Sequence, residues 1–236
     1  MKITFKGCNP SNYRKGREFP VHWIVLHFTA NNGDTAQNNA DFFARESGLR
    51  ASAHYFVDPN GVVQSVKDSD TAWHCGRERG GSYYNDCRNA NSIGIEMCSV
   101  IRNGVYVIPE ETMKRAAKLT RELMVKYHIP VSRVCRHYDV TRKNCPEPWI
   151  RNPQLWEKFK TMLTEKEDEE LVKSKKVLLN GKAYDCECID KNDVNYIKMR
   201  SLTQAGFTVS YDAVRKLPSI TAPQSRTFVP DCTAEV

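Results

Sequence analysis

The run from Val21 to Phe28 restricts the fold of this chain more than any other stretch of the sequence. Apart from His22 and His27, every residue of the run is apolar. A strand with one face in solvent alternates apolar and polar residues, whereas a strand covered on both faces is apolar throughout. We therefore predict a central strand in an α/β domain. His27 ends this strand, on the sheet edge where open α/β sheets bind their ligands.

Helices and further strands are expected around this strand. Apolar residues recur at three- and four-residue steps from Pro109 to His128, which predicts a long amphipathic helix. Shorter helices are expected over Thr35–Ser47 and from Pro153 onward. A hairpin is predicted from Ala53 to Val66, and Ser92–Met97 alternates as a strand does, with its glutamate opposite the isoleucines.

Three other stretches lack a periodic pattern. Residues 1–20 are predicted to form an extended arm, because proline and glycine interrupt them. Residues 68–91 are predicted to form a long irregular loop and, as such loops often carry function, a wall of a binding groove. The polar stretch Arg136–Pro146 is predicted to be a loop between two helical patterns.

The polar stretch gains a chemical meaning when it is set beside His27. It contains His137 and Cys145, and two imidazoles with one thiolate can occupy three corners of a tetrahedral zinc site, leaving the fourth open to water. A histidine taken alone is more often a structural residue, and we assign that role to His22, His54 and His128. Cys98 and Cys135 are predicted to be buried thiols.

Charge and composition narrow the partners. The formal net charge is +7, from 35 Lys and Arg against 28 Asp and Glu, which favours an anionic partner such as nucleic acid, anionic lipid or an acidic cell-wall polymer. The basic residues are scattered and accompany no nucleic-acid-binding signature, so nucleic acid is disfavoured. No run of roughly eighteen apolar residues occurs, so no membrane insertion is expected. The first residues contain no apolar signal-peptide core, so we expect synthesis in the cytoplasm, where most of the nine cysteines would stay reduced.

Five motifs stand out in the sequence, at Val25–Ala30, Ser52–Asp58, Ala72–Gly76, Asn91–Met97 and His137–Pro146. Together they resemble a known family, the zinc-dependent N-acetylmuramoyl-L-alanine amidases. This type-2 group includes phage endolysins and shares its fold with peptidoglycan recognition proteins. The resemblance covers roughly residues 18 to 163.

The resemblance implies a mixed central β-sheet flanked by helices and one Zn²⁺ ion held by His27, His137 and Cys145. It also implies that Glu96 transfers protons between water and the leaving amine, and that Lys143 stabilises the developing oxyanion. The reaction would be hydrolysis of the amide between N-acetylmuramic acid and L-alanine in peptidoglycan.

Three residues are expected to line the substrate groove: Thr29, Trp73 and His74. Relatives often carry a tyrosine where this chain has Ala53, and the tyrosine that follows at position 55 is not given a catalytic role.

The chain is expected to have three parts. Residues 1–163 would form the amidase catalytic domain, residues 164–175 a charged linker, and residues 176–236 a small α+β C-terminal module. The last part resembles a small domain, related to copper amine oxidase N-terminal domains, that is appended to some cell-wall enzymes. This implies wall attachment or self-association into a homo-oligomer, and we predict a structural role for the pair Cys186 and Cys188.

The favoured interpretation is a phage or prophage endolysin that acts on the cell wall after release from the cytoplasm. Two alternatives remain on the same fold. A non-catalytic peptidoglycan-binding receptor commonly lacks the cysteine ligand, and a muropeptide-recycling amidase tends to carry a carboxylate in its place. This chain keeps Cys145 together with Glu96 and Lys143.

Overall fold

The computed structural model of the chain describes residues 2–76, 80–164, 173–179, 182–191, 194–212 and 217–222. The chain divides into two compact units, Met1–Glu165 and Lys166–Val236. Most of the expected linker, residues 164–175, lies outside the described residues.

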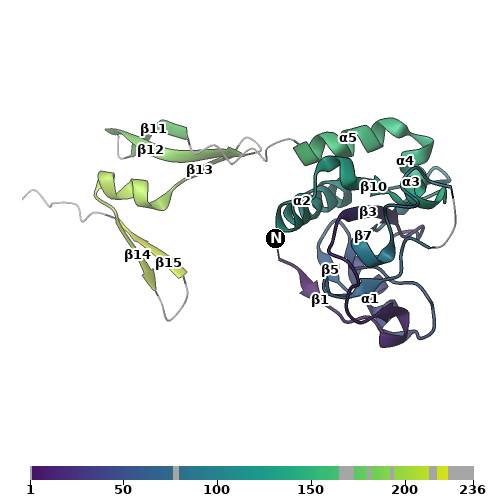
Figure 1. The fold of residues 1–236 in the computed structure, drawn as a ribbon. Helices are drawn as coiled ribbons and strands as arrows, with labels where there is room; N and C mark the ends of the chain where they lie inside the picture. Colours follow the sequence, from purple (N-terminus) through teal and green to yellow (C-terminus); the bar gives the residue numbers. More distant parts are fainter. Residues whose placement is uncertain are drawn as a thin grey trace, which may run out of the picture. The chain divides into compact units, whose positions relative to one another are not determined.

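A six-stranded mixed sheet forms the centre of the first unit, in the order β1-β5-β4-β7-β3-β10 (Figure 1). Its strands are β1 (Thr4–Phe5), β3 (Trp23–Phe28), β4 (Tyr55–Val57), β5 (Val62–Gln64), β7 (Ser92–Met97) and β10 (Val134–Arg136). Strands β4, β7, β3 and β10 run parallel to one another, and β5 runs antiparallel to β4. The predicted central strand, β3, therefore lies inside the sheet, and the predicted fold class is confirmed.

Helices cover both faces of this sheet (Figure 1). Two long helices, α2 (Glu110–Tyr127) and α5 (Pro153–Thr164), pack on one face, and α1 (Ala36–Arg45) packs against β4 and β5 on the other. Each of these helices lies within the range or at the start that the sequence predicts. Two short helices, α3 (His137–Thr141) and α4 (Glu147–Arg151), connect β10 to α5.

The alternation of side chains along β3 divides the sheet into an apolar face and a polar one. Ile24 and Leu26 are fully buried against α2 and α5. Burial of each such side chain stabilises the fold by roughly 1.5–3 kcal/mol. Val25 and His27 point to the opposite face, as do Gly94 and Glu96 of β7 by the same alternation. Because the face under α2 holds the largest core cluster, the opposite face can carry polar residues.

The structure differs from the sequence predictions in four stretches of the chain, each of which contains short elements that were not predicted. Residues 1–20 are not only an arm: β1 joins the sheet edge, η1 (Pro10–Asn12) follows, and β2 (Tyr13–Arg14) pairs with β6 (Thr71–Ala72). The loop 68–91 thus contains β6, and it leads into η2 (Asn89–Asn91). The polar stretch 136–146 begins with helix α3. A hairpin of β8 (Val100–Arg102) and β9 (Val105–Val107) was not predicted. Elements of two to five residues are too short to show a period, which is why the sequence pattern misses them.

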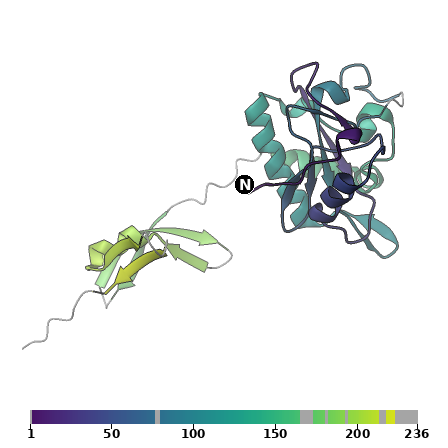
Figure 2. The same cartoon turned by 90° about the horizontal axis from the view of Figure 1, so that it is seen from below.

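The described residues of the second unit form small antiparallel sheets and a short 3-10 helix (Figures 1 and 2). Its elements are β11 (Lys173–Leu179), β12 (Lys182–Lys191), β13 (Val194–Ile197), η4 (Met199–Ala205), β14 (Thr208–Asp212) and β15 (Leu217–Thr221). Cys186 and Cys188 lie on one face of β12 and are both buried. In neither unit do the described residues include a helix with the length and apolarity needed to cross a bilayer.

Candidate metal centre

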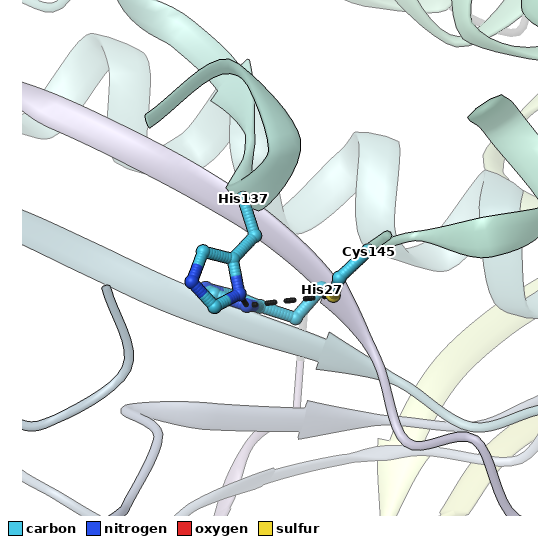
Figure 3. A group of neighbouring side chains, drawn as sticks. All are labelled: His27, His137 and Cys145. Carbon is cyan, nitrogen blue, oxygen red and sulfur yellow. Dashed lines mark hydrogen bonds between the residues drawn. The ribbon is translucent and has the colours of Figure 1, made fainter. Parts of the chain in front are cut away.

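The sheet order brings two histidines together at its carboxyl edge. His27 is near the end of β3, and His137 follows the last residue of the neighbouring parallel strand β10. Arg136 pairs with Leu26 in the register of these strands, so the residues that follow them, His137 and His27, lie side by side. The chain returns to the same place after α3, where Cys145 points at both imidazoles (Figure 3).

The three side chains converge on one point with separations that suit a metal ion. Nδ1 of His27 lies 3.1 Å from Nδ1 of His137 and 3.8 Å from Sγ of Cys145. In tetrahedral zinc coordination, two ligand nitrogens are about 3.3 Å apart, and a nitrogen and a sulfur about 3.6 Å apart. Among the histidine, cysteine and acidic side chains of the described residues, these three form a group that could hold a metal ion. Their spacing therefore fits zinc.

Burial changes the protonation of these donors in ways that bear on binding a cation. All three residues are at most 5% exposed. Burial lowers the pKa of His27 well below its usual value, helped by the charge of His137, and burial lowers the pKa of His137 to about 4. Both imidazoles are therefore neutral, with lone pairs free to bind. Burial raises the pKa of the Cys145 thiol, and a cation held beside it would favour the thiolate.

One carboxylate oxygen and one hydroxyl near the three donors have no hydrogen-bond partner in the part of the chain that the structure describes. Glu96 pairs with His27 in the β3–β7 register, and its oxygen Oε2 is shielded from solvent although the residue as a whole is half-buried. Neither this oxygen nor Oγ1 of Thr29 has a hydrogen-bond partner among the residues that the structure describes. Burial raises the pKa of Glu96 to about 8, although the positive charge of Lys143 acts in the opposite direction. Buried polar atoms without partners are rare in folded proteins, and at a site they point to a ligand or water.

An open cavity of about 680 Å³ contains the three donors, with Glu96 and the exposed Lys143 also on its wall. Thr29, Trp73 and His74 border the same cavity. A larger cavity of about 940 Å³ shares Trp73 but contains none of the three donors. The 680 Å³ cavity is therefore the candidate site, and the structure places on its wall every residue to which the sequence analysis assigned a role there.

The groove residues differ in what they offer to a ligand. Trp73 is half-buried, and Thr29 leaves its hydroxyl free. His74 is only 8% exposed, and both of its ring nitrogens face protein atoms. Tyr55 lies on the other face of the sheet, where its hydroxyl donates to Asp68.

One residue that holds this site was missed by sequence reasoning. Oδ1 of Asn89 accepts hydrogen bonds from the backbone N–H groups of His74 and Cys75, at 2.9 and 2.7 Å. An asparagine in a polar loop carries no pattern that predicts such a contact. The fold alone brings it into place.

Comparison with known proteins gives the same picture. A family described as N-acetylmuramoyl-L-alanine amidase (Amidase_2) matches residues 17–148. A probable N-acetylmuramoyl-L-alanine amidase of Bacillus licheniformis is 37% identical over 137 residues, which are 56% of this chain and 38% of that protein. The N-acetylmuramoyl-L-alanine amidase BlyA of Bacillus subtilis (strain 168) is 35% identical over 157 residues, 62% of this chain and 42% of that protein. The chain thus matches about two fifths of the length of these relatives.

Solved structures share the architecture of the first unit. The catalytic domain of XlyA superposes with a TM-score of 0.56 at 25% identity, covering 69% of this chain and 99% of that domain. The catalytic domain of PlyG gives a TM-score of 0.55 at 25% identity, covering 71% of this chain and 99% of that domain. A mutant endolysin from Bacillus subtilis gives 0.56 at 26% identity, covering 69% of this chain and 99% of that protein.

Proposed function

The chain belongs to the N-acetylmuramoyl-L-alanine amidase family, and from this premise we propose that it hydrolyses the amide between N-acetylmuramic acid and L-alanine in peptidoglycan. The observation that carries the proposal is the convergence of His27, His137 and Cys145 in an open cavity beside Glu96, whose Oε2 finds no hydrogen-bond partner among the described residues. A peptidoglycan receptor needs a groove, but it has no use for three metal donors next to a buried carboxylate.

We propose that one Zn²⁺ ion is held by Nδ1 of His27, Nδ1 of His137 and Sγ of Cys145. The donor spacing supports this assignment, as does the neutral state in which burial keeps both imidazoles. When bound, zinc supplies a Lewis acid that polarises a carbonyl and makes water more acidic. Three protein ligands leave one coordination position for solvent or substrate, as in other catalytic zinc sites.

Glu96 is proposed to move the protons of the reaction. Its Oε2 accepts a proton from the attacking water and returns it to the departing amine of L-alanine. A carboxyl group whose pKa is raised by burial to about 8 can both take up and release a proton near neutral pH, as the two steps require. The ammonium of Lys143 reaches the same cavity and stabilises negative charge on the amide oxygen as it develops.

Thr29 and Trp73 are proposed to orient the substrate. The hydroxyl of Thr29 is free for a hydrogen bond, and the indole of Trp73 offers an apolar surface for a sugar ring or a peptide. A cavity of about 680 Å³ is within the usual range for sites that bind small ligands.

At the level of the whole chain, we propose an endolysin-like enzyme that degrades the cell wall, with peptidoglycan as its partner. Residues 176–236 would attach the enzyme to the wall or join two copies of the chain. The net charge of +7 supports an anionic wall polymer as the surface to which it binds.

The chemistry is tested with Glu96→Gln, which keeps the shape of the side chain, and Cys145→Ala, which removes a donor. Each variant is expected to lower the hydrolysis rate by roughly a hundredfold or more, because a proton carrier or a metal ligand is lost. Mass spectrometry of digested peptidoglycan measures the result, since cleavage of this bond creates new L-alanine amino termini. Glu96→Gln should still bind one equivalent of zinc, whereas Cys145→Ala should not.

The control is Cys8→Ala, which removes a buried thiol from a different core cluster. It should change neither the zinc content nor the products. Sacculi that bind the wild-type protein but yield no new L-alanine termini would refute the enzyme and support the receptor instead.

A further inference from the structure

The second nitrogen of a metal-binding histidine begins a chain of hydrogen bonds in this structure. His27 turns Nδ1 toward the other two donors, and its Nε2 lies 3.1 Å from Nδ1 of His74. Nε2 of His74 lies 3.2 Å from the hydroxyl of Ser92. That hydroxyl donates a bond of 2.6 Å to the carbonyl of Arg88. This series of hydrogen bonds runs from the proposed metal site to the backbone carbonyl of Arg88.

Because this series of hydrogen bonds ends at a carbonyl oxygen, the position of every proton in it is determined. A carbonyl oxygen can only accept a hydrogen bond, so the hydroxyl of Ser92 donates its proton to the carbonyl of Arg88. The hydroxyl oxygen then accepts a hydrogen bond from Nε2–H of His74. A neutral His74 with its proton on Nε2 has a lone pair on Nδ1, so Nε2 of His27 must be the donor between the two rings. The remaining nitrogen of His27, Nδ1, then carries the lone pair that a metal ion needs. The network therefore selects the metal-binding tautomer of His27.

His74 is held in place from three sides. Asn89 accepts hydrogen bonds from its backbone N–H and from that of Cys75. The preceding residue, Trp73, is bonded in both directions to Ser52, with its N–H donating to Ser52 Oγ at 2.9 Å and its carbonyl accepting from Ser52 N at 2.9 Å. The ring itself lies against the backbone of β7 at Gly94, where a Cβ atom would be 2.5 Å from its Cγ. A side chain pinned in this way can hold another in a fixed orientation.

The same segment also supports the second imidazole. The backbone of Cys75 faces His137 and raises the pKa of that residue against the effect of burial. The segment Trp73–Gly76 therefore contacts both histidines of the centre, one through a side chain and one through the backbone.

We propose that His74 is a positioning residue that fixes the orientation and tautomer of the metal ligand His27. The inference rests on the zinc site proposed above, and it gives His74 a role different from the substrate-binding one expected from the sequence. Both of its nitrogens are engaged within the protein, so neither is free for a substrate. The thiol of Cys75 lies 3.2 Å from the same Nδ1, but a thiol is a weak donor beside an imidazole N–H.

The proposal is tested by a matched pair, His74→Asn and His74→Phe, in the full chain. The amide oxygen of asparagine can take the place of Nδ1 as acceptor, whereas phenylalanine keeps a ring and offers no acceptor. We measure the zinc dissociation constant by competition with a chelator. His74→Phe should weaken zinc binding about 10- to 100-fold, the usual effect of losing the partner of a metal-bound histidine. His74→Asn should stay within about threefold of the wild type, because the accepting atom is restored.

Two further readouts separate positioning from a loss of structure. Nitrogen NMR of the zinc-loaded wild-type protein should show the Nε2–H proton of His27 protected from exchange with water, and His74→Phe should lose that protection. The absorption spectrum of the cobalt-loaded protein should change in His74→Phe and return toward the wild type in His74→Asn. If His74→Phe does not fold by circular dichroism, Ser92→Ala decides: by removing the next partner in the chain, it should weaken zinc binding in the same direction but less.

The outcomes distinguish this inference from the proposed function. A wild-type protein that binds no zinc would overturn the metal site itself. A wild-type protein that binds zinc, together with a folded His74→Phe of unchanged affinity and unchanged His27 signal, would overturn only the role of His74. Equal losses in His74→Phe and His74→Asn would overturn it as well, because the accepting atom would then not matter.

Discussion

Gly94 has no side chain, and the ring of His74 fills the space where one would project. A Cβ atom there would lie 2.5 Å from Cγ and 2.8 Å from Nδ1 of His74, closer than nonbonded atoms approach. We expect Gly94→Ala to destabilise the protein by about 1–3 kcal/mol, as overpacking in a tight site does. It should also weaken zinc binding, since the ring that contacts His27 must move. Denaturant unfolding and the zinc competition assay measure the two effects.

A second glycine supplies the control for this substitution. Nothing lies within 4 Å of a Cβ atom built on Gly61, and its φ angle is not positive. Gly61→Ala should therefore leave zinc binding unchanged and stability the same or slightly higher. If Gly94→Ala behaves in the same way as Gly61→Ala, the close packing of His74 against Gly94 contributes neither to stability nor to zinc binding.

Asp68 connects the loop after β5 to helix α2 through a network of hydrogen bonds. Its carboxylate accepts from Lys126 at 2.8 Å, Tyr127 at 2.7 Å, Tyr55 at 2.6 Å and Gln64 at 2.9 Å. Burial alone would raise the pKa of Asp68, but these donors outweigh burial and hold it below its usual value of 3.8. A lowered folded-state pKa stabilises the protein above the unfolded pKa, and this stabilisation is lost as the pH falls through the folded value.

We therefore expect the free energy of unfolding to decline as the pH falls below about 4, with Asp68 contributing to the decline. Asp68→Asn should lower stability at neutral pH by about 1–3 kcal/mol, because it replaces a charged acceptor within a buried network. It should also make the decline below pH 4 shallower. Urea unfolding over a pH series measures both effects. Glu111→Gln, which removes an exposed carboxylate, should change stability by about 0.5 kcal/mol or less, and an equal effect of the two variants would contradict the network.

Among the larger elements, the loop 68–91 is held at both of its ends by Arg17. The guanidinium donates to the carbonyl of Asp68 at the start of the loop, and to those of Asn89 and Ala90 near its end, at 3.5 and 3.4 Å. The side chain of Asn89 in turn fixes the backbone of His74. An arginine of the N-terminal segment thus maintains the loop that supports the proposed metal ligands.

We expect Arg17→Met to loosen this loop, because three carbonyls lose their donor at once. Hydrogen exchange should accelerate about tenfold or more in the described residues of the loop, while amides of β3 and α2 stay protected. Arg14→Met is the control, because Arg14 is exposed and makes one ion pair with Glu18 at 3.6 Å. Similar exchange rates in the two variants would show that Arg17 does not hold the loop.

The elements that the sequence predicted well are those with a long, regular pattern. Strand β7 coincides with the predicted Ser92–Met97, and α2 differs from its predicted range by one residue at each end. The hairpin of β8 and β9 was not predicted, although the sequence contains a signal for its turn. Asn103 and Gly104 both have positive φ angles, 50° and 77°, as a two-residue hairpin turn requires, and an Asn-Gly pair between apolar residues is its usual sign.

The site shows a different limit of sequence reasoning. His27, His137 and Cys145 could be named because His27 ends the predicted strand and the other two lie in the polar stretch, and parallel strands end at one edge. The direction in which a ring nitrogen points could not be predicted, because it depends on side-chain torsions and on distant partners such as Asn89 and Ser92. The support of His27 by His74 is therefore visible only in the three-dimensional structure.

At the scale of the whole molecule, the chain combines a unit that holds the candidate site with a second unit that contains none of the three donors. The first unit has its own large core and the complete candidate site, so it is expected to fold alone. A chain ending at Thr164, the last residue of α5, can therefore be compared with the full chain. The comparison isolates what the second unit contributes.

If the second unit attaches the enzyme to the wall, its effect should depend on the substrate. A soluble muropeptide cannot retain a tethered enzyme, so both chains should cleave it at the same rate. On intact sacculi, attachment raises the local concentration of the enzyme, and the shortened chain should be about tenfold slower or worse at low enzyme concentration. Release of L-alanine amino termini measures both reactions. Equal rates on sacculi would rule out attachment, and light scattering of the two chains would then show whether the second unit joins copies of the protein instead.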